Sequence, residues 1–174
     1  MAPYWRYAIE LFPFRKRRVP VARFSCKSRR QTFSLLPIQL IPYFQYTMDA
    51  VVGTLLLALR LRQSGQRGFY GASVQVDAES DVTPWLVACW LSVVTGGLRR
   101  AHAVLGRFYD VDQVSTGEGG GALWTEVRTY LIAFARGSPP EGPQVVADPV
   151  RRYALATGLF LIGRPSQSRR RRGG

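Results

Sequence analysis

The stretch RFSCKSRRQTFSLLPIQLIPYFQY, residues 23–46, decides how the N-terminal part of the chain folds. Residues 19–24 and 31–35 are rich in β-branched and aromatic side chains, and a short basic segment separates them. This pattern predicts two short strands joined by a basic turn. Pro37 and Pro42 then keep the chain extended, because proline lacks an N–H group and disfavours helix in the residue before it.

Cys26 lies in the basic turn, and Thr32, Phe33 and Ser34 follow in the second strand. This arrangement resembles a zinc-ribbon-like domain family of unknown function that accompanies bacterial transposases, with a Cys-x-x-Cys knuckle and a Thr-Phe-Ser strand. The resemblance implies the DNA-binding portion of a transposase without its catalytic domain. Arg29 stands where the second cysteine belongs, and no cysteine precedes Cys26. Because a structural zinc site has four ligands, the resemblance implies a degenerate, metal-free ribbon with Cys26 as a remnant ligand position.

The chain is strongly basic, with 24 Lys and Arg against 11 Asp and Glu and a net charge of +13. The excess lies at the two ends. Residues 1–30 hold nine basic side chains and one acidic, and residues 151–174 hold seven basic and none acidic. Such an excess is typical of proteins that bind a polyanion. An apolar content of 47% over 174 residues is normal for one globular domain.

Hydrophobic periodicity predicts helices over most of the remaining chain. Residues 48–63 follow Thr47 as an N-cap and present a broad apolar face. Gly65 and Gly68 are expected to end this helix. The pattern over residues 71–79 leaves a short helix and an irregular loop both open.

Thr83 and Pro84 mark the start of a second long apolar segment. Gly96 and Gly97 interrupt it, and two glycines cost about 2 kcal/mol relative to alanine within a helix. The sequence therefore leaves open whether residues 84–106 form one kinked helix or two helices, which would make a helix-turn-helix.

Residues 123–135 predict an amphipathic helix after a flexible glycine linker at residues 118–121, and Asp148 caps a last helix to about Ile162. The predicted fold is mostly α with a short N-terminal β-hairpin, an α+β protein. Its expected parts are residues 1–46 as a basic ribbon-like hairpin and extended segment, 47–116 as a helical core with the helix-turn-helix as one alternative, 117–163 as C-terminal helices, and 164–174 as a disordered Arg-rich tail.

The sequence contains no recognisable catalytic constellation. Cys26 and Cys89 predict no disulfide framework, and Cys89 lies in an apolar run typical of a core. His102, the single histidine, has no evident partner and is expected on the surface. The acidic residues form loose groups, and the glycine run 119–121 lacks the Lys-Ser/Thr ending of a phosphate loop. We therefore expect no enzyme, no cofactor and no small-molecule substrate.

Binding to duplex DNA is the function that the sequence favours. Basic side chains near the N-terminus alternate with Phe12, Phe14, Phe24 and Phe33, rings that can wedge or stack. Because the start of the segment 84–106 is apolar, we expect phosphate contacts rather than base readout. The candidate contacts are Arg15, Lys16, Arg17, Arg18, Arg23, Lys27, Arg29, Arg30, Arg99, Arg100, Arg169, Arg170, Arg171 and Arg172.

Two other interpretations stay open. One is a decayed mobile-element reading frame without selected activity, which the missing zinc ligands favour. The other is a cationic peripheral membrane protein whose aromatic residues enter anionic lipid. The apolar runs at residues 51–59, 84–94 and 153–162 are shorter than the roughly 18 residues of a spanning helix, so no transmembrane segment is expected. The sparse cysteines favour a cytoplasmic protein, located at the nucleoid if it binds DNA.

Overall fold

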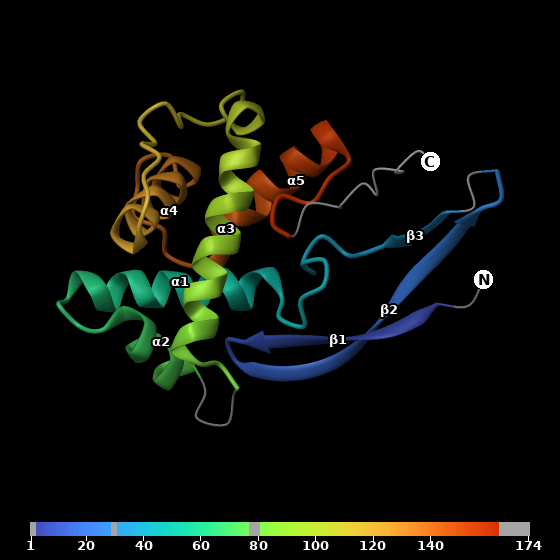
Figure 1. Ribbon diagram of the computed structural model, residues 1–174, viewed down its shortest axis with the longest axis horizontal. Helices are drawn as coiled ribbons and strands as arrows, with labels where there is room; N and C mark the ends of the chain where they lie inside the picture. The colour runs from blue at the N-terminus through green and yellow to red at the C-terminus, as the bar shows by residue number, and fades with distance from the viewer. Residues whose placement is uncertain (1–2, 29–30, 77–80, 164–174) are drawn as a thin grey trace, which may run out of the picture.

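The computed structural model describes residues 3–28, 31–76 and 81–163. Within these ranges a three-stranded antiparallel sheet precedes five α-helices, and about half of the chain is helical (Figure 1). The prediction of a mostly helical α+β protein is therefore confirmed. The elements are β1 Tyr4–Leu11, β2 Phe14–Cys26, β3 Gln31–Leu35, α1 Met48–Gln63, α2 Gly68–Val76, α3 Pro84–Leu105, α4 Gly120–Phe134, the 3₁₀ turn η1 Pro143–Val146, and α5 Ala147–Thr157.

The sheet is larger than the hairpin that the sequence predicts. β2 is the central strand, and its first part pairs with β1 from Leu11↔Phe14 to Tyr4↔Val21. Its last part changes partner and pairs with β3, beginning at Ala22. The predicted strand 31–35 coincides with β3, whereas the predicted strand at residues 19–24 is only a part of β2.

The end of β1 ties the sheet to the helices. Ala8, Ile9 and Leu11 are buried there. The backbone N–H of Ile9 donates to the carbonyl of Gln45 at 2.8 Å, and the N–H of Thr47 donates to the carbonyl of Ile9 at 3.0 Å. The segment that enters α1 therefore runs beside β1, which fixes the sheet relative to the first helix.

α1 has the predicted bounds. The Thr47 hydroxyl accepts a hydrogen bond from the backbone N–H of Ala50 at 3.2 Å, as expected for an N-cap. The predicted face of Val51, Leu55 and Leu59 is buried. Gly68, expected to end this helix, instead begins α2. The segment 71–79, which the sequence left open, is helical as far as Val76, and residues 77–79 lie outside the described residues.

α3 is one continuous helix through Gly96 and Gly97, so of the two alternatives left open for this segment the structure has the single helix and not the helix-turn-helix. The reason is packing. A Cβ on Gly97 would lie 2.5 Å from the carbonyl oxygen of Leu161 and 3.3 Å from the Cα of Ile162. Glycine at this position lets the chain after α5 pack directly on α3, and that packing offsets the low helix propensity of glycine.

The last helices differ from the prediction at their ends. α4 begins at Gly120, so part of the expected glycine linker is its first turn. α5 ends at Thr157, before Gly158 with φ 70°, rather than near Ile162. Buried apolar residues from β1 through Ile162 form one cluster, so the helices of both predicted helical parts share a core.

Candidate nucleic-acid interface

The three strands form an arm that extends away from the helices, and we call β1, β2 and β3 together the β arm (Figure 1). Large rings stay exposed on it, namely those of Tyr4, Trp5, Tyr7, Phe14 and Phe24. Basic side chains are exposed beside them, namely Arg15, Lys16, Arg17, Arg18, Arg23 and Lys27. A cluster of exposed aromatic residues is typical of an interaction surface, because their burial by a partner is favourable.

Rings and cations alternate across β1 and β2 on one face of the arm. Trp5 and Tyr7 share this face because side chains two residues apart lie on the same side of a strand. The register pairs Trp5 with Pro20 and Tyr7 with Arg18, so each ring has a basic neighbour on the diagonal. The Arg18 guanidinium lies 5.4 Å from the ring centre of Trp5, and the Lys16 ammonium lies 4.8 Å from that of Tyr7. We call Trp5, Arg18, Tyr7 and Lys16 the cation–aromatic ladder.

The ladder keeps its positive charge. Neither Lys16 nor Arg18 forms an ion pair with a carboxylate in the described residues. By contrast, Arg17 pairs with Glu10 across the strands. A cation over an exposed ring gains about 0.5–1 kcal/mol, so the rings restrict the two basic side chains without neutralising them.

The opposite face of the arm contributes less. Arg23 lies 5.7 Å from the ring centre of Tyr4, but Arg6 donates from Nη2 to the carbonyl of Ile41 at 2.7 Å. Burial lowers the pKa of the Arg6 guanidinium from its ordinary value, and nearby Tyr4 opposes this effect. Arg6 therefore joins the arm to the segment before α1, and this hydrogen bond occupies one of its donors.

The outer end of the arm contains a shallow hollow of about 590 Å³, lined among others by Arg23, Phe24 and Lys27. Cys26 lies at the end of β2, with its Sγ 3.1 Å from the Ser28 hydroxyl. In the portions of the chain that the structure describes, no three His, Cys, Asp or Glu side chains lie close enough to hold a metal ion.

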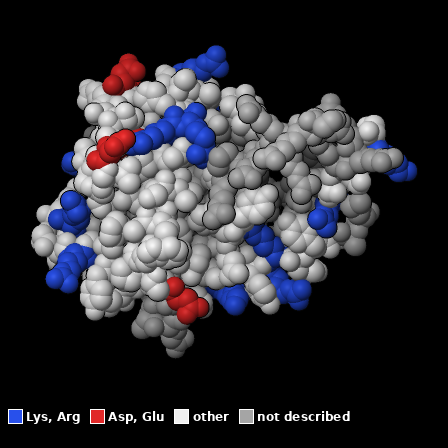
Figure 2. All heavy atoms as spheres, in the orientation of Figure 1, with Lys and Arg blue, Asp and Glu red and all other residues white. Residues whose placement is uncertain are grey.

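The β arm brings together most of the basic residues singled out near the N-terminus. Arg15, Lys16, Arg17, Arg18 and Arg23 are exposed on β2, and Lys27 is exposed directly after it. Figure 2 shows basic side chains spaced along the side of the molecule that holds the sheet. The other candidate contacts lie outside the described residues, namely Arg29, Arg30, Arg169, Arg170, Arg171 and Arg172. The tail that the sequence predicts to be disordered, residues 164–174, also lies outside them.

Arg99 and Arg100 of α3 have structural partners instead. Arg99 donates to both carboxylate oxygens of the fully buried Glu126, at 2.6–3.1 Å, and to the carbonyl of Gly117 at 2.6 Å. The hydrogen bonds with Glu126 raise the pKa of Arg99. Arg100 donates to the carbonyl of Gly163 at 2.9 Å. Because α3 is a single helix, neither arginine lies on the recognition helix of a helix-turn-helix, and both hold hydrogen bonds within the helical part of the molecule.

His102 is half-buried rather than on the surface, which corrects the sequence prediction. Its Nδ1 lies 2.8 Å from the hydroxyl of Tyr130, a residue 28 positions away. Burial, together with the charge of Glu126, raises the pKa of Tyr130 to about 12, so this hydroxyl stays protonated. Cys89, expected in the core, is only partly buried.

The rings of β1 were missed by sequence reasoning, which singled out phenylalanines instead. The ring of Phe12 packs on α1, because a Cβ on Gly53 would lie 2.7 Å from it. The available signal was the period-two order of Trp5, Tyr7, Ile9 and Leu11, which is typical of a strand with one apolar face.

Comparison with known proteins gave no relative: no family model, no curated protein and no solved structure matches this chain. Among the described residues, no helix combines the length and the apolar character needed to cross a membrane.

Proposed function

We propose that this protein is a non-catalytic DNA-binding protein whose β arm contacts the phosphates of a duplex. The observation that carries the proposal is the cation–aromatic ladder, in which Lys16 and Arg18 lie against exposed rings and have no acidic partner among the described residues. The resemblance of residues 23–46 to transposase-associated ribbons is consistent with this proposal but does not identify a DNA site.

The dimensions of the arm support this function. A two-stranded β-ribbon fits the major groove, which is about 12 Å wide. Along β2, basic side chains at successive positions point to alternate faces, so Arg15 lies on the face opposite to Lys16 and Arg18. A ribbon in the groove with the ladder face inward would therefore place Lys16 and Arg18 next to the DNA and leave Arg15 on the outer face.

The side-chain chemistry favours contacts with the backbone of DNA over reading of its sequence. Residues 4–26 contain no Asn or Gln, the side chains that pair with adenine through two hydrogen bonds. Arg and Lys contact phosphates of any sequence. The exposed rings of Trp5 and Tyr7 add a surface on which bases of any identity can stack or be wedged apart.

The test is a fluorescence-anisotropy titration of a labelled random duplex at several salt concentrations. We expect log affinity to fall with log salt, and the Lys16→Ala/Arg18→Ala variant to reduce the slope by about two units. The control variant Arg62→Ala/Arg128→Ala removes the same charge from exposed sites on α1 and α4. It should leave the slope nearly unchanged.

Equal losses in the ladder and control variants would contradict the proposal, because they would indicate a general effect of net charge. Trp5→Ala should weaken binding without changing the salt slope, since ring contacts are not screened. A parallel titration measures binding to anionic vesicles at the same salt concentrations. Vesicle binding that persists at a salt concentration where DNA binding is lost would show that the arm is a membrane-surface element instead.

A further inference from the structure

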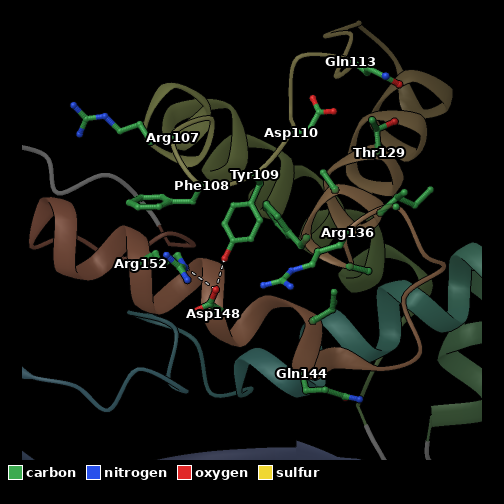
Figure 3. Close-up of a pocket in the computed structure, with 16 residues that line it drawn as sticks. Arg107, Phe108, Tyr109, Asp110, Gln113, Thr129, Arg136, Gln144, Asp148 and Arg152 are labelled. Carbon is green, nitrogen blue, oxygen red and sulfur yellow. Dashed lines mark hydrogen bonds and ion pairs between the residues drawn. The ribbon is translucent and has the colours of Figure 1, made fainter.

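A second candidate site lies on the helical part of the molecule, between the C-terminal ends of α3 and α4 and the start of α5 (Figure 3). It is an open hollow of about 1060 Å³, as large as typical small-molecule sites. Its apolar wall includes Ile132, Ala133 and Val145. Its charged residues are Arg107, Asp110, Arg136, Asp148 and Arg152.

The hollow contains two acidic residues, and the negative charge of one of them, Asp148, is compensated by arginines. Asp148 accepts hydrogen bonds from Arg152 Nε at 2.6 Å and from the Tyr109 hydroxyl at 2.7 Å, and Arg151 pairs with its other oxygen at 3.4 Å. The Arg152 guanidinium also lies 5.1 Å from the ring centre of Phe108. With Asp148 paired twice, the positive charge of the remaining arginines exceeds the negative charge of Asp110.

Arg107 and Arg136 are the lining arginines without such a commitment in the described part of the chain. The Arg107 side chain points away from Tyr109 and Asp148 (Figure 3), which leaves Arg136. It follows α4, and its side chain reaches into the hollow toward Tyr109 and Asp148 (Figure 3). Within the described ranges it forms no side-chain hydrogen bond and no ion pair. A guanidinium offers five donors in a planar fork that matches the oxygens of a phosphate or carboxylate.

The backbone conformation of Arg136 is a second, independent observation that favours a ligand-binding role for this residue. Its φ is 55°, in the left-handed region where glycine or asparagine is usual at the end of a helix. The turn is closed by the Gly137 N–H, which donates to the carbonyl of Ile132 at 2.9 Å. Nothing in that turn requires an arginine side chain, so this left-handed position holds an exposed guanidinium that is available to a ligand.

We propose that this hollow binds a small organic oxyanion, a phosphate or carboxylate group attached to an apolar body. Arg136 would bind the oxyanion, and Ile132, Ala133 and Val145 would cover the apolar body. The site is separate from the β arm, and the proposal does not depend on DNA binding.

The experiment is isothermal titration calorimetry of the full chain with phenyl phosphate, and with benzoate in a parallel series to distinguish a phosphate from a carboxylate. Arg136→Gly removes the guanidinium and places the favoured residue at the positive φ. We expect this variant to melt at the same or a higher temperature and to bind phenyl phosphate at least about tenfold more weakly. Arg128→Ala, which removes an exposed arginine from α4 outside the hollow, should keep the affinity within about twofold.

Three results would overturn the proposal. The first is that neither anion shows saturable binding to the unmodified chain at up to about 10 mM. The second is that Arg136→Gly binds phenyl phosphate as tightly as the unmodified chain does. The third is that Arg128→Ala weakens binding as much as Arg136→Gly, because the signal would then follow net charge rather than this site.

Discussion

At the scale of single residues, one ion pair compensates the buried negative charge of Glu126. Its side chain is fully buried, and Arg99, with 37% of its side chain exposed, supplies the ion pair. Removing one member of a buried pair leaves the other charge uncompensated, which costs about 3–5 kcal/mol in fully buried cases. Because Arg99 is partly exposed, we expect Arg99→Ala to lower the free energy of unfolding by about 2–4 kcal/mol, measured by urea denaturation.

A double variant separates this loss from a simple loss of packing. Arg99→Met with Glu126→Leu removes both charges and keeps apolar volume, so most of the stability should return. If Arg99→Ala changed the unfolding free energy by less than about 0.5 kcal/mol, the pair would not stabilise the fold.

Asp148 gives the protein an acid-sensitive contact. Hydrogen bonds from Arg152 and then Tyr109 lower the pKa of Asp148 below its ordinary value. The unfolded chain therefore takes up a proton at a higher pH than the folded chain does. The ionised carboxylate stabilises the fold above about pH 4, and this stabilisation is lost as the pH falls through the folded-state pKa.

The melting temperature of the Asp148→Asn variant should consequently fall less between about pH 6 and about pH 3 than that of the unmodified chain. Asp110→Asn is the matched control, because Asp110 is exposed and has no side-chain hydrogen bond or ion pair among the described residues. It should keep the normal acid response. Equal responses of the two variants, measured by thermal melts, would show that Asp148 is not the sensitive group.

At the scale of elements, adjacent glycines of α3 have opposite surroundings. A Cβ on Gly96 would meet only the end of the Arg100 side chain, at 3.5 Å, whereas a Cβ on Gly97 would collide with the backbone of Leu161. Gly96→Ala should therefore stabilise the protein by roughly 0.5–1 kcal/mol through helix propensity. Gly97→Ala should destabilise it by about 1–3 kcal/mol through overpacking.

Chemical denaturation of the two variants measures both effects. Two stabilising substitutions would mean that the chain after α5 does not pack on Gly97. Two destabilising substitutions would mean that glycine is needed in α3 for another reason, such as a bend.

The elements also show what a sequence can reveal. α1 was predicted to the residue because Thr47, Asp49 and its apolar face are local signals. The continuity of α3 was not predictable, since the residues that decide it, Leu161 and Ile162, are more than 60 positions from Gly97. β1 was missed although its period-two order is a local signal. The part of β2 that pairs with it contains the basic run 15–18, which has no such alternation, so the pairing that stabilises β1 was not predicted.

At the scale of the whole molecule, composition predicted a basic N-terminal surface but not its geometry. The cation–aromatic ladder exists only because the β1–β2 register sets each ring diagonal to a cation, and register depends on the turn and on burial. The hollow around Arg136 was beyond sequence reasoning, since its lining comes from α4, α5, the 3₁₀ turn and the segment after α3, between residues 107 and 152. The partner of Glu126 likewise lies 27 positions away.

The change of partner along β2 has a consequence for how the protein opens. Up to Val21 the strand pairs with β1, which is tied to α1, but from Ala22 onward its partner is β3 alone. Such an outer ladder can separate without disturbing the helical core, as a cooperative unit of low stability. In native-state hydrogen exchange we expect the amides of residues 22–26 to exchange through an opening that denaturant hardly accelerates. Amides in the middle of α1 and α3 should exchange only through global unfolding, and identical denaturant dependence in both regions would show instead that arm and core unfold as one unit.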